Sequence, residues 1–155
     1  MLYLYFNPFF MMRVREIKVS YNLPNTNRRK IHSSKDLYEL AINQWNYDTI
    51  EMQEEIKVIL LNRANEVIGI YELSKGGISG TVLDIKLLLS VALKCLASSI
   101  ALVHNHPSGN LKPSDSDCKI TKKVKSACKQ VDIVLLDHII ISKTHYYSFS
   151  DYGKL

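Results

Sequence analysis

The segment Val103-His104-Asn105-His106-Pro107-Ser108-Gly109 has the most informative spacing in the chain. It follows an apolar run, residues 99–103, that predicts a buried strand. Because side chains alternate along a strand, His104 and His106 are expected to point to the same side at its end. Two imidazoles on one side of a strand end are half of a metal site.

An irregular loop and a helix are expected next. Pro107, Gly109 and Pro113 favour irregular backbone, because proline fixes φ and glycine permits positive φ. Ser114 is a good helix N-cap, and Ser114-x-x-Asp117 has the spacing of a capping box. Asp117 is therefore expected in the first helical turn, where the loop can bring it back towards the two histidines.

His104, His106 and Asp117 form a ligand set of two nitrogens and one oxygen. Such a set suits zinc, with a fourth position left open for water, and an open zinc site supports amide hydrolysis. The two histidines alone are more typical of a solvated loop beside an ordinary helix cap. The complete pattern, with its proline, capping serine and downstream aspartate, favours a site for one Zn²⁺ per chain.

These residues also resemble a known motif. His104-Asn-His-Pro-Ser-Gly, followed by Pro113-Ser114-x-x-Asp117, is similar to the JAMM (Jab/MPN+) metallopeptidase motif in the form carried by RadC proteins. The similarity extends from about Glu54 to Leu155, and Asn105 is the RadC-like variant of a position that is usually Ser or Thr in eukaryotic relatives. Other segments that resemble the RadC pattern are Gly80-Thr81, Thr121, Leu136-Asp137-His138-Ile139-Ile140 and Ser148-Phe149.

The resemblance implies a zinc-dependent, deubiquitinase-like fold of the JAMM/MPN (cytidine-deaminase-like) type, with a catalytic glutamate on an earlier strand. It does not supply a substrate, because RadC proteins carry a DNA-repair label beside a peptidase-like site. RadC proteins often place a helix-hairpin-helix segment before the catalytic domain. The roughly fifty residues that precede the motif region here contain no Gly-rich hairpin of that kind.

Composition limits the protein class. A chain of 155 residues with 46% hydrophobic and 23% charged residues is typical of one soluble globular domain. It is too short for a TIM-barrel amidohydrolase, which also carries two histidines at a strand end but needs about 250 residues. Three cysteines without CxxC spacing fit reduced thiols in a cytoplasmic protein, and Cys118 could approach the metal from beside Asp117.

The first fifty residues are expected to form an N-terminal extension, and residues 51–155 the zinc domain. Met1–Met12 is apolar but too short to span a bilayer, and it lacks signal-peptide features, so no membrane association is expected. This stretch is either a docking strand or a poorly ordered start. We then expect a strand near Ile17–Tyr21, a basic loop over Leu23–Lys30 and a helix from Ser33 or Ser34 to Trp45.

The second part predicts a mixed sheet sandwiched by helices, an α/β (α+β) fold, because strands and helices mix without strict alternation. The helix over Ile85–Ala97 is apolar almost all round and is expected to be central and covered. A second helix follows Asp117. The expected strands are 54–61 and 67–71, which form a hairpin, then 99–103, then 133–136 and 139–142 around Asp137-His138, and finally 146–149.

A mononuclear zinc hydrolase needs a general base, and the candidates are Glu51, Glu54, Glu55 and Glu72. The resemblance places the family glutamate on Glu54, counting back from the Leu-Leu-Asn that ends this strand, although the register could slip by one. Glu55 would point to the opposite side of the strand, so the two cannot share the role.

Two further positions have alternative interpretations. Ser114 caps the helix, and the resemblance implies that it also helps to hold the oxyanion that forms in the reaction. Whether Ser114 is only a cap or has both roles is left open. Asp137 and His138 could be a second metal pair, but their apolar flanks favour a structural hydrogen-bonded pair.

The sequence thus predicts a JAMM-type zinc metallohydrolase that cleaves a peptide or isopeptide bond in a peptide or protein substrate. The alternative is a nucleic-acid-associated accessory protein with a structural or vestigial metal site. That alternative draws on the formal charge of +5 and on the family's repair label. A direct nuclease is less favoured, because phosphodiester cleavage commonly uses two metals. Homo-oligomer formation is left open.

Overall fold

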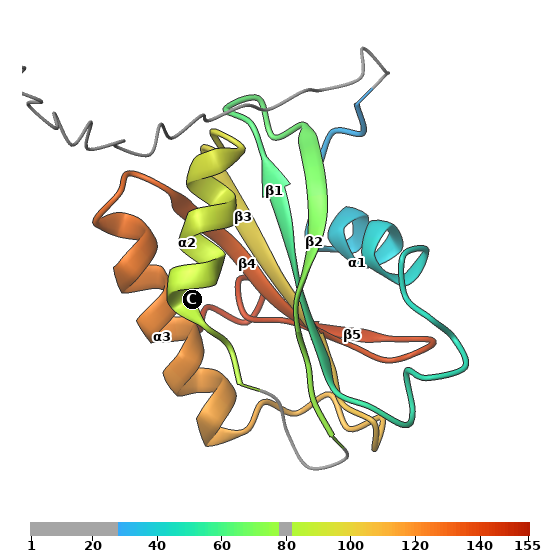
Figure 1. The fold of residues 1–155 in the computed structure, drawn as a ribbon. Helices are drawn as coiled ribbons and strands as arrows, with labels where there is room; N and C mark the ends of the chain where they lie inside the picture. Colours follow the sequence, from blue (N-terminus) through green and yellow to red (C-terminus); the bar gives the residue numbers. More distant parts are fainter. Residues whose placement is uncertain (1–27, 78–81) are drawn as a thin grey trace, which may run out of the picture.

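The computed structural model describes residues 28–77 and 82–155. The expected strand near Ile17–Tyr21, most of the basic loop and the segment 78–81 lie outside these residues. The described part forms one five-stranded mixed sheet and three helices, which confirms the expected α+β class (Figure 1). In chain order the elements are α1 (Ser34–Ile42), β1 (Glu55–Leu61), β2 (Val67–Lys75), α2 (Ile85–Lys94), β3 (Ser99–Asn105), α3 (Asp115–Lys129), β4 (Val134–Ile141) and β5 (Tyr146–Ser148).

The strands follow the order β2-β1-β3-β4-β5. β1 is antiparallel to both β2 and β3, β4 is antiparallel to β5, and β3 and β4 are parallel and joined through α3. Ile56 of β1 lies opposite His104 of β3, so the first residues of β1 lie next to the last residues of β3. The topology therefore brings the segment around Glu54 to the two histidines.

Helices cover both faces of the sheet (Figure 1). On one face, α2 and α3 pack over alternate strand residues such as Val58 and Leu102. On the other face, α1 packs over the intervening residues, among them Ile59 and Val103. All seven residues of β1 are buried, as expected of a strand covered on both sides. Within the described residues, no helix is long and apolar enough to cross a membrane.

The expectation of a covered central helix was wrong for α2. Only Leu88 and Ala92 are fully buried, because α2 lies on the outside of the sheet and presents one side to it. Its other side carries exposed apolar residues, with Leu93 49% exposed and Leu87 37% exposed. The helix also ends at Lys94, before Ala97.

The two strands expected around Asp137-His138 are one continuous strand, β4. The pairing shifts by one residue between Ile100–Leu135 and Ala101–Asp137, which is a bulge at Leu136. The bulge lets Leu135 and His138 share the face that carries α3, whereas Asp137 lies on the face that carries α1. A polar pair can thus lie inside a buried strand without interrupting it.

Two element ends also differ from expectation. Of the two serines predicted to start α1, Ser33 is the cap, through a capping box with Asp36, but the helix ends at Ile42 rather than near Trp45. Trp45 is nevertheless buried with the α1 side of the core. β2 continues to Lys75, four residues beyond the predicted strand end at residue 71.

Candidate metal centre

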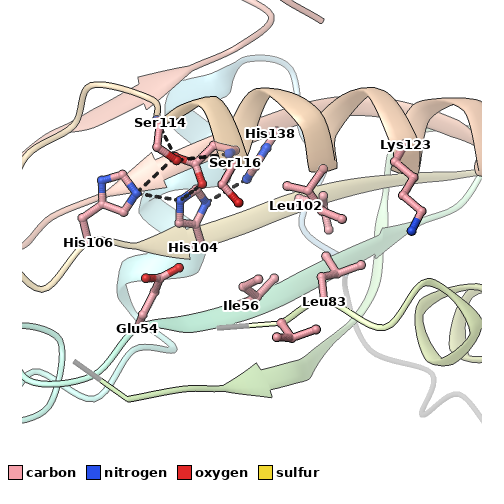
Figure 2. Close-up of a pocket in the computed structure, with 13 residues that line it drawn as sticks. Glu54, Ile56, Leu83, Leu102, His104, His106, Ser114, Ser116, Lys123 and His138 are labelled. Carbon is pink, nitrogen blue, oxygen red and sulfur yellow. Dashed lines mark hydrogen bonds and ion pairs between the residues drawn. The ribbon is translucent and has the colours of Figure 1, made fainter. Parts of the chain in front are cut away.

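Three side chains converge where β3 ends and α3 begins (Figure 2). The Nε2 atoms of His104 and His106 are 2.9 Å apart. Asp117 Oδ1 lies 3.3 Å from His104 Nε2, and Asp117 Oδ2 lies 3.5 Å from His106 Nε2. The structure therefore brings together the three residues that the sequence singled out as candidate ligands.

The connection between β3 and α3 explains how Asp117 reaches the histidines. Gly109 has a φ of +71°, a left-handed conformation that suits glycine and turns the loop back. Ser114 then caps α3, and its backbone N–H and its hydroxyl both donate to Asp117 Oδ2 at 2.7 Å. The capping box thus fixes the carboxylate by Oδ2 and leaves Oδ1 directed at His104.

This donor set fits a metal ion. Ligands at 2.0–2.1 Å from a tetrahedral zinc lie about 3.3 Å from each other. The two histidine nitrogens are 2.9 Å apart, and His104 Nε2 is 3.3 Å from Asp117 Oδ1, so both separations are close to that value. Cys118, which could have joined the site from beside Asp117, is not in the cluster of ligand atoms found among the described residues.

Hydrogen bonds prepare His106 and Asp117 for this role. His106 Nδ1 is 2.5 Å from the carbonyl of Asn110, which can only accept, so Nδ1 carries the hydrogen and Nε2 offers its lone pair. The hydrogen bond with Asp117 raises the pKa of His106, against the effect of burial. Burial would raise the pKa of Asp117, but the neighbouring side chains of His104, His106 and Ser114 outweigh it and hold that pKa well below its ordinary value.

The cluster opens into a cleft of about 520 Å³. Figure 2 shows the carboxylate of Glu54 facing His104 and His106 across this cleft, with Lys123 farther away along α3. The apolar side chains that line the cleft are Ile56, Val82, Leu83, Leu102 and Ile120. The carboxylate of Glu54, which binds no other described side chain, therefore lies beside the candidate metal site.

The three other glutamate candidates lie outside the cleft. Glu55 is buried and paired with Lys75 at 3.1 Å, and Glu51 is exposed and paired with Lys143 at 2.7 Å. Glu72 is 4.0 Å from a lysine on β1 and does not line the cleft. Of the four candidates, only Glu54 faces the candidate metal site.

Asn105 holds the segment that carries Glu54. Its Oδ1 accepts from the backbone N–H of Glu55 at 2.8 Å, and its Nδ2 donates to the carbonyls of Ile50 and Gln53 at 2.6 and 2.7 Å. The side chain is fully buried, so water does not compete for these bonds. Sequence analysis identified Asn105 only as a variant within the motif, because its hydrogen-bond partners lie about fifty residues earlier in the chain.

Ser114 uses its one hydroxyl hydrogen on the Asp117 carboxylate and accepts from the Asp117 backbone N–H at 3.1 Å. Both bonds belong to the helix cap. In this arrangement Ser114 orients a candidate ligand, and its hydroxyl would have to rotate away from Asp117 to reach an oxyanion.

Asp137 and His138 are a hydrogen-bonded pair, as the apolar flanks favoured, because the backbone N–H of His138 donates to Asp137 Oδ1 at 2.7 Å. They do not form a metal pair, since their side chains lie on opposite sides of the sheet. Asp137 accepts from the Ser148 hydroxyl at 2.6 Å and from the Ser150 backbone N–H at 3.0 Å on the α1 side of the sheet. Burial raises the pKa of Asp137. His138 lies on the other side, where its Nε2 is 2.8 Å from His104 Nδ1. Sequence analysis considered His138 only together with Asp137 and missed its contact with His104.

Comparison with known proteins places these features in a family. A family model described as RadC-like JAB domain matches residues 31–154. The chain is similar to a UPF0758 protein of Flavobacterium johnsoniae, with 44% identity over 128 residues that cover 81% of this chain and 53% of the relative. A UPF0758 protein of Porphyromonas gingivalis is 43% identical over 104 residues, 66% of this chain and 46% of the relative. A UPF0758 protein of Chlorobium phaeovibrioides is 36% identical over 131 residues, which cover 84% of this chain and 57% of the relative. The chain spans about half the length of these relatives.

Proposed function

The chain belongs to the RadC-like JAB domain family, and from that premise we propose that it is a zinc metallohydrolase that cleaves a peptide or isopeptide bond. One observation carries the proposal: two imidazole nitrogens and a carboxylate converge in a cleft that also presents a separate carboxylate. The ligands would be His104, His106 and Asp117, through Nε2, Nε2 and Oδ1. Zinc held by three protein ligands supplies a Lewis acid that activates water and polarises a carbonyl.

Glu54 would act as the general base and then as the general acid. Its position across the cleft from the ligands suits a group that takes a proton from the attacking water. The same carboxyl group can then pass the proton to the leaving amine. The apolar lining of the cleft strengthens such charge interactions, because it excludes part of the surrounding water.

Ser114 would be a positioning residue that fixes Asp117, and contact with a developing oxyanion would be its second role. The two roles separate in kinetics. Loss of the hydroxyl in Ser114→Ala weakens zinc binding if it positions Asp117, whereas it lowers kcat at full zinc occupancy if it contacts the oxyanion.

The test is hydrolysis of a panel of peptide and isopeptide substrates by the zinc-loaded protein. Glu54→Gln is expected to lower kcat about 100-fold or more and to retain zinc. Glu51→Gln is the matched control, because Glu51 is exposed and outside the cleft, and it should behave as the unsubstituted protein. Equal loss in both variants, or full activity in Glu54→Gln, would contradict the assignment.

A nucleic-acid-associated role is the second candidate function. It is supported by five exposed lysines on α3, none of which makes an ion pair with another described residue: Lys119, Lys122, Lys123, Lys125 and Lys129. DNA binding that weakens steeply with salt and survives removal of zinc would favour this role. Substrate hydrolysis without measurable DNA affinity would favour the hydrolase.

We also infer a reducing compartment such as the cytoplasm. Cys95, Cys118 and Cys128 are all free thiols in the structure. Quantitative thiol titration of protein isolated without reductant should find three free thiols per unfolded chain.

A further inference from the structure

A chain of short hydrogen bonds runs from the candidate ligand His104 into the buried region between β3, β4 and α3. It connects His104 on β3, His138 on β4 and Thr121 on α3, and it ends on the backbone carbonyl of Asp117. We propose that His138 and Thr121 are positioning residues that hold His104 in the one tautomer whose Nε2 can bind a metal. The inference rests on the proposed function only in treating His104 as a ligand.

The order of the protons is fixed at the Thr121 end. The Thr121 hydroxyl oxygen is 2.6 Å from the carbonyl oxygen of Asp117. A carbonyl cannot donate, and two oxygens at this distance need a hydrogen between them, so the single hydroxyl hydrogen lies there. Thr121 therefore has only acceptor capacity left for His138.

The remaining protons follow one by one. His138 Nδ1 is 2.6 Å from the Thr121 hydroxyl oxygen, so Nδ1 must donate, and a neutral His138 then has a lone pair on Nε2. That Nε2 is 2.8 Å from His104 Nδ1, which must in turn donate. A neutral His104 is left with its lone pair on Nε2, which lies 2.9 Å from His106 Nε2 and 3.3 Å from Asp117 Oδ1. These three acceptors face one another, so a cation has to lie between them.

The opposite order would disable the site. If Thr121 donated to His138, then His138 would donate to His104, and the hydrogen of His104 would lie on Nε2. It would then occupy the direction in which a metal has to bind. The contact between Thr121 and the Asp117 carbonyl is what excludes this order.

Burial and stacking keep the chain in place. His104, Thr121 and His138 are each at most 2% exposed, so water has little access to replace a missing partner. The ring of Phe149, itself buried, stacks on His138 with a centroid separation of 4.8 Å and an interplanar angle of 7°. Because the chain starts at one ligand and ends on the backbone of another, it also couples the positions of β3 and α3.

The direct test compares zinc affinity in Thr121→Val and Thr121→Ser, measured by competition with a chromophoric chelator. Valine keeps the shape but removes the acceptor oxygen, and we expect zinc binding to weaken about 10- to 100-fold. Serine restores the hydroxyl and should bring the affinity back to within about threefold of the unsubstituted protein. Ser116→Ala is the control, because Ser116 lies on the same helix and lines the cleft but is outside the chain of hydrogen bonds. Unchanged affinity in Thr121→Val, or equal losses in the valine and serine variants, would overturn the proposal.

A second measurement does not depend on zinc. In metal-free protein at about pH 8, nitrogen-15 NMR of the imidazoles reports which ring nitrogen carries the hydrogen. We expect hydrogen on Nδ1 in both His104 and His138, and a mixture of tautomers at His104 in Thr121→Val. A His104 Nδ1 without hydrogen in the unsubstituted protein would overturn the proposal. If that protein bound no zinc while His104 had its hydrogen on Nδ1, the hydrolase assignment would fail and the proton order would stand.

Discussion

Glu54 and Glu55 are adjacent in the sequence, yet they lie in different surroundings. Glu54 lines the cleft, whereas Glu55 is buried against Lys75, because alternate residues face opposite sides at the start of β1. The alternation was readable from the sequence, and so was the local motif of His104, His106 and Asp117. Their spacing lies within one strand end and one helix cap, which short-range rules describe.

The partners of the motif were not readable, because they come from distant parts of the chain. His138 reaches His104 only after β3 and β4 pair in parallel with a bulge, which no periodicity predicts. Asn105 likewise binds backbone groups that approach it through the β1–β3 pairing. The motif can be recognised from neighbouring residues in the sequence, whereas the contacts of His138 and Asn105 form only in the tertiary structure.

The role of Asn105 makes a prediction at this scale. Asn105→Ala removes three buried hydrogen bonds and leaves the backbone groups of Ile50, Gln53 and Glu55 without those partners. The free energy of unfolding should fall by about 3 kcal/mol. Chemical denaturation measures this, with Asn43→Ala as the exposed control, which should change stability by less than about 0.5 kcal/mol. A loss below about 1 kcal/mol in Asn105→Ala would contradict the bonding described.

At the scale of elements, most strands and helices followed from hydrophobic pattern and capping. The β1–β2 hairpin, the α3 cap at Ser114 and the α1 cap at Ser33 were all predicted. The burial of α2 was not, because an all-round apolar helix does not reveal whether a second layer covers it. In the described part of the chain, no such layer lies over the side that carries Leu93.

Two leucines of α2 test this orientation. Leu88→Ala should lower the free energy of unfolding by about 2–5 kcal/mol, because Leu88 is fully buried against the sheet. Leu93→Ala should lower it by less than about 1 kcal/mol, because half of Leu93 is exposed. Equal losses, measured by chemical denaturation under the same conditions, would mean that the outer side of α2 is covered in solution.

Cys128 on α3 gives a pH-dependent test. Burial raises the pKa of its thiol from 9.0 to about 11. The thiol's contribution to stability is therefore fully present below pH 9 and is lost as the pH rises through 11. In folded protein at about pH 8, alkylation followed by mass spectrometry should modify Cys95 and Cys118 well before Cys128, since both are partly exposed. Modification of all three at one rate without denaturant would contradict this packing.

At the scale of the whole molecule, the fold does not depend on the candidate metal. Two apolar clusters, one on each face of the sheet, bury most of the large side chains, and neither includes the proposed ligands. A strong chelator should therefore leave the far-ultraviolet circular dichroism unchanged. Zinc at 100 times its dissociation constant should add about 2.7 kcal/mol of stability.

That gain corresponds to a rise in Tm of about 5–10 °C for a chain of this size. Asp117→Asn is the control, and its Tm should not respond to zinc, because the carboxylate ligand is gone. Unfolding on chelation would show that the fold does depend on the metal, and an equal response in the variant would show that zinc acts elsewhere in the molecule.

The most direct measurement of the central claim is metal content by elemental mass spectrometry, on protein purified without added metal. The account predicts about one zinc per chain in the unsubstituted protein and in Glu54→Gln, whose carboxylate lies outside the ligand set. It predicts loss of that zinc in both His104→Ala and Asp117→Ala. No bound metal in the unsubstituted protein, even after zinc is supplied, would contradict the account.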